Sequence, residues 1–164
     1  MSAINHKKLF ELAKPFLNKN DFGLEHTKRV YDIATTYFTI PESIRDLTYS
    51  SIFLHDIGGS SIRDQIKKGP KIAKTLLEQL NCKQEFIRKV CEIIKTHHSH
   101  PNNPSLSFQI LHDSDKLVMF SCEEFPHYNS TPNFDWNHVI TLIYSDKIKK
   151  LAKEFLKKRK LNNS

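Results

Sequence analysis

An almost continuous helical repeat of apolar side chains constrains this sequence more than any other feature. Apolar residues return every three or four positions through nearly all of the 164 residues, and no segment shows the sustained alternation of a half-buried strand. The segment near residue 30 is typical, because its spacing puts His26 on the same face as Val30 and Ile33. The sequence therefore predicts an all-α fold.

Proline, glycine and asparagine divide this repeat into about six to seven helices, which we expect to form one compact domain over residues 1–164. The segment 123–135, with Pro126 and Pro132, is expected to be a loop. Three aromatic residues in or next to this segment, Tyr128, Phe134 and Trp136, could line a pocket mouth or an interface. The expected helices cover residues 5–18, 24–38, 41–57, 69–80, 84–98, 105–118 and about 136–158, the last being amphipathic and followed by a frayed tail.

Composition narrows the class of protein and of partner. Hydrophobic residues make up 38% of the chain and charged residues 26%, which is typical of a soluble globular protein. Cys82, Cys91 and Cys122 show no C-x-x-C spacing, so we expect reduced thiols and a cytoplasmic location. No apolar run approaches the ~18 residues that cross a bilayer, so we expect no membrane partner.

The net charge of +7 favours an anionic partner. A solvated helix face nevertheless explains the basic run near the end of the chain better than a nucleic-acid contact does. A basic helical nucleic-acid binder is therefore the weakest of the alternatives kept here. The run consists of Lys147, Lys149, Lys150, Lys153, Lys157, Lys158, Arg159 and Lys160.

Four residues of metal-ligand type lie far apart in the sequence, inside apolar helical segments: His26, the adjacent pair His55 and Asp56, and Asp115. A buried imidazole or carboxylate needs a partner, and one shared cation would serve all four. Two nitrogen and two oxygen ligands suit Mn, Fe, Co, Ni or Mg better than structural zinc. The glycines at 58 and 59 would let both neighbours converge on the ion and a substrate approach the backbone.

Two acids in the run 111–117 compete for the last ligand position. Asp115 follows Leu111 by four residues and precedes Val118 by three, so it lies on the apolar face of its helix. Asp113 points partly outward. We therefore expect Asp115 to be the ligand, and Asp113 to be either an orienting residue or, more readily, a surface acid.

The order His, His-Asp, Asp resembles the HD-domain superfamily of metal-dependent phosphohydrolases, over roughly residues 20–120. The run D-S-D-K-L at 113–117 is similar to the D-A-D-K-L run of small single-domain HD proteins, in which the second aspartate is a ligand and the lysine lies near the substrate phosphate. The resemblance implies an HD-like helical fold, one or two divalent ions held by the four residues above, and Lys116 beside the phosphate.

A histidine cluster closes the helix that ends before Pro101. The apolar face of that helix lies nearer His97 than His98. HD proteins carry a histidine in this region that contacts the substrate phosphate or a second metal, so the resemblance implies this role for His97, with His98 in reserve. The alternative is a polar helix end where the dipole favours histidine.

Two departures from the family pattern limit the resemblance. Dinuclear HD phosphodiesterases place another histidine before a helix-opening glycine, and residues 64–70 contain none, so we expect a single metal. Nucleotidase-like members follow His-Asp with an acid, which residues 58–60 lack. Four basic residues, Arg63, Lys67, Lys68 and Lys71, instead offer positive charge for several phosphates, or form a solvated basic turn.

The expected function is hydrolysis of a phosphoester, as a phosphomonoesterase or phosphodiesterase, on a nucleotide or another small phosphorylated metabolite. Lys116 and His97 would stabilise charge on the phosphate, and Asp56 or Asp113 would take the proton of the attacking water. His98 and the basic residues between 63 and 68 would bind the substrate. A non-catalytic ligand-binding HD module is the main alternative, and the sequence leaves the oligomeric state open.

Overall fold

The computed structural model describes residues 3–163, and within them all regular secondary structure is helical. The prediction of an all-α fold is confirmed. Ten helices follow one another in this part of the chain. They are α1 (His6–Leu17), α2 (Gly23–Tyr37), α3 (Glu42–Leu54), α4 (Ile62–Lys67), α5 (Gly69–Gln79), α6 (Gln84–Thr96), α7 (Leu106–Val118), α8 (Phe125–Asn129), α9 (Trp136–Leu142) and α10 (Asp146–Asn162).

The predicted number of six to seven helices is wrong, because three segments differ from the expected pattern. The polar stretch after residue 60 contains α4 and the expected loop 123–135 contains α8, both too short to show a period. The expected last helix is divided into α9 and α10. Ile143 is extended there, and the Ser145 hydroxyl starts α10 by accepting the backbone N–H of Ile148. No proline or glycine marks this break in the sequence.

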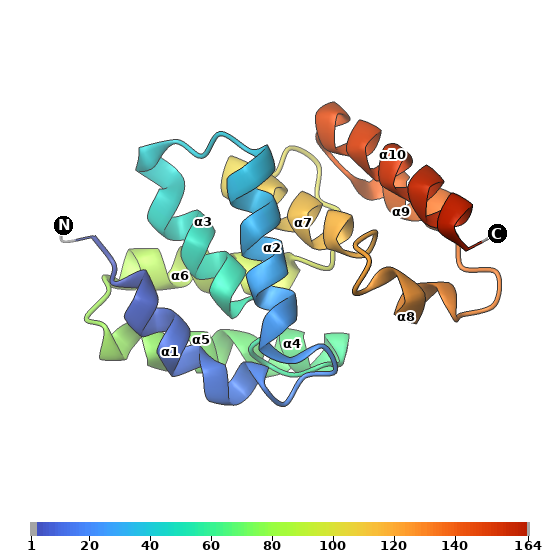
Figure 1. Ribbon diagram of the computed structural model, residues 1–164. Helices are drawn as coiled ribbons and strands as arrows, with labels where there is room; N and C mark the ends of the chain where they lie inside the picture. Colours follow the sequence, from blue (N-terminus) through green and yellow to red (C-terminus); the bar gives the residue numbers. More distant parts are fainter. Residues whose placement is uncertain (1–2, 164) are drawn as a thin grey trace.

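Three helices, α2, α3 and α7, pack against one another at the centre of the molecule (Figure 1). On one side, α1 packs on α3, and α5 pairs with α6, which also contacts α3 and α4. At the other end, α9 and α10 pack against each other and against α7. Of the helices between residues 3 and 163, none has the length and apolar character needed to span a membrane.

Buried apolar side chains form two clusters, and α7 contributes to both. The larger cluster lies among α1–α3 and α5–α7 and includes Leu54, Ile94 and Leu111. The smaller cluster joins the end of α7 to the following helices and includes Phe120 and Trp136. The end of α7 is therefore held from two sides, which fixes the position of the polar residues it carries.

Candidate metal centre

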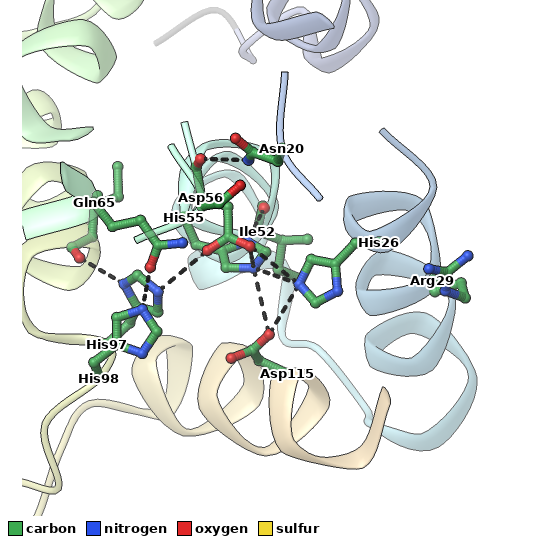
Figure 2. A network of polar contacts seen from close by, with 12 residues as sticks. Asn20, His26, Arg29, Ile52, His55, Asp56, Gln65, His97, His98 and Asp115 are labelled. Atoms are coloured by element: carbon green, nitrogen blue, oxygen red, sulfur yellow. Dashed lines mark hydrogen bonds and ion pairs between the residues drawn. The ribbon is translucent and has the colours of Figure 1, made fainter. Parts of the chain in front are cut away.

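Four side chains of ligand type meet between α2, α3 and α7, and Figure 2 shows them pointing toward one another. His26 lies in the first turn of α2 and Asp115 in the last turn of α7. His55 caps the end of α3, and Asp56 follows it in a turn. Because the chain leaves the helix at this point, two sequence neighbours can approach the same place. The expected convergence of the four residues is what the structure has.

The distances within this cluster are short and nearly equal. His26 Nε2 lies 3.3 Å from Asp56 Oδ2 and 3.1 Å from Asp115 Oδ1. His55 Nε2 lies 3.4 Å and 3.6 Å from the same two oxygens. The two imidazole nitrogens are 3.2 Å apart. Ligand atoms about 2.0–2.2 Å from one ion are separated by about 2.8–3.6 Å when they occupy neighbouring octahedral or tetrahedral positions, so this geometry fits a divalent metal.

Hydrogen bonds at the far side of each ring favour the ligand form of the histidines. The Nδ1–H of His55 donates to the carbonyl of Ile52 at 2.7 Å, and that of His97 donates to Ile94 at 2.6 Å. Both rings thus bind a carbonyl left unpaired at a helix end. The other nitrogen, Nε2, then carries a lone pair that faces the cluster. A buried lone pair of this kind needs a proton or a metal ion as its partner.

The charges of the cluster reinforce one another. Burial lowers the pKa of His26, but hydrogen bonds to Asp115 and Glu124 outweigh it and raise this pKa to about 11. Burial raises the pKa of Asp56, but the charge of His55 outweighs it and lowers this pKa to about 2. The pKa of Asp115 also lies well below its usual value in spite of burial, because of its histidine neighbours. The carboxylates are ionised, and a metal ion would displace the imidazole proton.

A second group of possible ligands shares Asp56 with the first and adds His97 and His98. His97 Nε2 is buried without a hydrogen-bond partner and lies 3.6 Å from Asp56 Oδ1. Burial and His97 lower the pKa of His98 to about 4, so His98 is neutral, and its Nε2–H donates to Gln65 Oε1. With these hydrogen bonds, neither ring offers an N–H group to a phosphate. Because a second group of possible ligands lies beside the first, the expectation of a single metal ion remains a prediction.

A cavity of about 350 Å³ opens onto the cluster. His26, Asp56 and Asp115 line it, as do Lys116 and His98. Its remaining walls were not foreseen from the sequence, apart from Tyr128. They include the aromatic side chains of Phe22, His127 and Tyr128, the apolar side chains of Ile62 and Met119, and the polar side chains of Asn20, Ser60 and Gln65. The residues before α2 and in α8 carry no ligand motif, so the sequence held no signal for them.

Several predicted site residues lie apart from the cavity. Arg63, Lys67 and Lys68 are exposed on or beside α4 and do not line it, and Lys68 pairs with Asp64 at 3.1 Å. His97 is buried beneath the cavity instead of lining it. The glycine at 58 serves the fold, because a Cβ there would lie 2.5 Å from the backbone oxygen of Asp64. Its expected role in substrate access is not supported.

The expectation for Asp113 is wrong. This side chain is fully buried and is neither a surface acid nor an orienting residue of the cluster. Its two oxygens accept the backbone N–H groups of Tyr144 and Ser145, each at 2.8 Å. Asp113 therefore anchors the connection between α9 and α10 to α7. Trp136, left undecided between pocket and interface, is buried in the smaller apolar cluster.

One further carboxylate, Glu124, contacts the cluster and was missed by the sequence analysis. It is completely buried, and its Oε1 lies 2.8 Å from Nδ1 of His26. Arg29 donates to the same oxygen. Glu124 lies in the segment that was expected to be a loop, so neither helical period nor motif pointed to it.

Comparison with known proteins gives one result. Residues 23–119, more than half of the chain, match the HD domain, whose members are typically metal-dependent phosphohydrolases. No curated protein and no solved structure matched the chain. The match contains all four residues of the buried cluster, His26, His55, Asp56 and Asp115. With its helical fold and its His/Asp cluster, this chain belongs to the HD-domain family.

Proposed function

We propose that this protein is a metal-dependent phosphohydrolase that cleaves a phosphoester of a nucleotide or of another small phosphorylated metabolite. The observation that carries the proposal is a cavity of about 350 Å³ lined by three of the four ligand residues, His26, Asp56 and Asp115. The fourth, His55, is fully buried and contacts them from behind. The cavity volume lies within the usual range of ligand pockets. A buried cluster without an opening would fit a structural metal equally well, whereas this one can receive a substrate.

In this proposal His26, His55, Asp56 and Asp115 hold one divalent ion. A bound ion of this kind polarises a phosphoryl oxygen and lowers the pKa of a coordinated water. Which of Mn, Fe, Co, Ni or Mg binds is left to experiment. The second group formed with His97 and His98 would be a weaker site, because one of its three ligands is shared and His98 is already hydrogen-bonded to Gln65.

The side chains around the ion have separate tasks. Asp56 faces the two ligand histidines with Oδ2 and His97 with Oδ1, so it is placed to take the proton of the attacking water. Asp113, the other candidate for this step, is occupied by backbone donors. Lys116 lines the cavity and would stabilise the negative charge that develops on the phosphate. His97 would act through Asp56, and His98 would border the substrate.

The aromatic wall of the cavity favours a nucleotide among phosphorylated metabolites. The ring centroids of Phe22 and Tyr128 are 6.0 Å apart, and that of His127 is 4.9 Å from Phe22. Planar bases stack on such side chains at about 1–3 kcal/mol each. Because the Phe22 ring also stacks on the ring of His26, with centroids 6.1 Å apart, the two substrates are compared with each other. We expect Phe22→Ala to lower kcat/KM about tenfold more for a nucleoside monophosphate than for ribose 5-phosphate. An equal loss for both would remove the support for a nucleotide.

The proposal is tested by a screen of the purified protein with each metal in turn. The substrates are nucleoside mono-, di- and triphosphates, ribose 5-phosphate and an aryl phosphate. We expect phosphate release that requires added metal and stops with a chelator. A folded protein that binds metal and nucleotide but releases no phosphate would instead support the non-catalytic ligand-binding module.

A further inference from the structure

We infer that Glu124 is a positioning residue for His26 and that Arg29 holds Glu124 in place. The inference rests on the metal centre proposed above and adds to it a part of the chain outside the HD match at residues 23–119. The buried carboxylate binds the side of the His26 ring that faces away from the cluster, with Oε1 2.8 Å from Nδ1.

The contacts of Glu124 come from two directions. Its own segment is set by a turn, in which the Ser121 hydroxyl accepts the backbone N–H of Glu124 at 3.2 Å. Its side chain reaches back to α2, where Arg29 lies almost one turn beyond His26. Arg29 donates to Oε1 through Nε at 3.0 Å and through Nη2 at 2.8 Å. Charge-assisted bonds of this length hold a carboxylate firmly.

The distribution of donors on Glu124 points to a role beyond packing. Three nitrogen atoms gather on Oε1, from His26 and Arg29, while Oε2 is buried without a partner. An unpaired buried oxygen is costly, and a carboxylate kept only for stability would have both oxygens satisfied. Asp113 has that arrangement, with one backbone donor on each oxygen.

The hydrogen bond between Glu124 and His26 determines which ring nitrogen of His26 can bind a metal ion. When Nδ1–H donates to Glu124, the lone pair lies on Nε2, the atom that faces Asp56 and Asp115. A carboxylate partner also makes the imidazole a stronger ligand, and loss of such partners typically weakens metal binding by about 10- to 100-fold. His55 and His97 use a backbone carbonyl for the same purpose, so only His26 among the three has a charged partner.

The test compares metal binding by the wild-type chain and by variants, with Mn²⁺ affinity measured by calorimetry and Co²⁺ coordination by visible absorption. We expect Glu124→Ala to weaken Mn²⁺ binding by about 10- to 100-fold and to alter the Co²⁺ spectrum. Glu124→Gln keeps an acceptor without its charge, so its loss should be smaller. Glu123→Gln, which removes a charge from the exposed neighbour, should match the wild type.

The outcomes separate this inference from the proposed function. A wild-type chain that binds no metal would overturn both. Wild-type affinity and an unchanged Co²⁺ spectrum in folded Glu124→Ala would overturn the inference alone. If circular dichroism shows that Glu124→Ala does not fold, the Arg29→Lys variant is measured in its place. Lysine keeps the positive charge at this position but lacks the guanidinium group that donates twice to Glu124. A several-fold weaker metal affinity supports the inference, and wild-type affinity contradicts it.

Discussion

Asp113 and Asp115 lie two residues apart on α7, are both largely shielded from solvent, and have opposite roles. The oxygens of Asp113 face the connection between α9 and α10 and accept two backbone N–H groups. Asp115 faces α2 and α3, where Oδ1 lies 3.1 Å from His26 Nε2 and 3.6 Å from His55 Nε2. The two faces of one helix thus carry a structural carboxylate and a candidate metal ligand.

The difference shows that burial alone does not identify a metal-binding acid. A carboxylate with a protein donor on each oxygen is complete without any ligand. Asp115 instead faces Nε2 of His26 and Nε2 of His55. The Nδ1–H group of His55 is already bound to the carbonyl of Ile52. What marks the candidate metal centre is therefore a set of ligand atoms directed at one point, where a proton or a divalent cation can be shared.

Among the variants considered, replacement of Asp115 is expected to have the largest effect on activity. Asp115→Ala removes a ligand, and we expect phosphohydrolase activity to fall by at least about 10³-fold because the ion supplies several kcal/mol of transition-state stabilisation. The helix content should stay the same. Activity and bound metal are measured on the same folded sample. Wild-type metal content in this variant would show that Asp115 is not a metal ligand and does not differ from Asp113 in this respect.

Replacement of Asp113 should lower stability and leave metal binding unchanged. Asp113→Ala leaves two partly buried backbone donors, those of Tyr144 and Ser145, without their acceptor, so we expect the free energy of unfolding to fall by about 2–3 kcal/mol. The folded fraction should bind metal with wild-type affinity. Urea unfolding and a metal titration measure the two quantities. A stable Asp113→Ala protein that has lost its metal would assign Asp113 to the metal centre.

Asp113 and Asp115 also show which features of the site could be predicted from the sequence and which could not. The helical period of α7 correctly turned Asp115 toward the interior, because Leu111 and Val118 on that face report burial. It could not place Asp113, whose partners exist only because the expected helix 136–158 breaks near Tyr144 without proline or glycine. Glu124 was missed for a similar reason, since its contacts with His26 and Arg29, across 98 and 95 residues, leave no periodic trace.

Much of the fold and of the central cluster could be predicted, because long amphipathic helices and widely spaced ligand residues are visible locally. The walls of the cavity could not. Phe22 and Tyr128 come from short segments whose positions depend on how α2 and the smaller apolar cluster pack. The exposed position of Lys67 has the same origin, because the sequence shows charge near the motif but not the direction in which α4 turns it.

A smaller effect is expected from Lys116, the residue after Asp115, which lines the cavity. Lys116→Ala should lower kcat/KM by about 10²-fold, the usual loss when one group that stabilises developing charge is removed. Metal affinity should change little, which separates this side chain from its neighbour. The variant is assayed at saturating metal. A kcat/KM equal to that of the wild type would show that the substrate phosphate does not bind next to Lys116.

The smallest effect is expected from Lys67, a cation of the same type outside the cavity lining. Lys67→Ala should change kcat/KM for a nucleoside monophosphate by less than about twofold, because an exposed charge at a distance is screened by salt. A substrate with a chain of phosphates could reach it and would show a larger loss. A tenfold loss with the monophosphate would place α4 in the binding site.

The most direct test of the metal centre is anomalous diffraction from crystals grown with Mn²⁺. We expect a peak within about 2.0–2.3 Å of four atoms: His26 Nε2, His55 Nε2, Asp56 Oδ2 and Asp115 Oδ1. We expect no peak beside Asp113. A well-ordered cluster without density for the ion at saturating Mn²⁺, or an ion bound only elsewhere, would contradict the proposed metal centre.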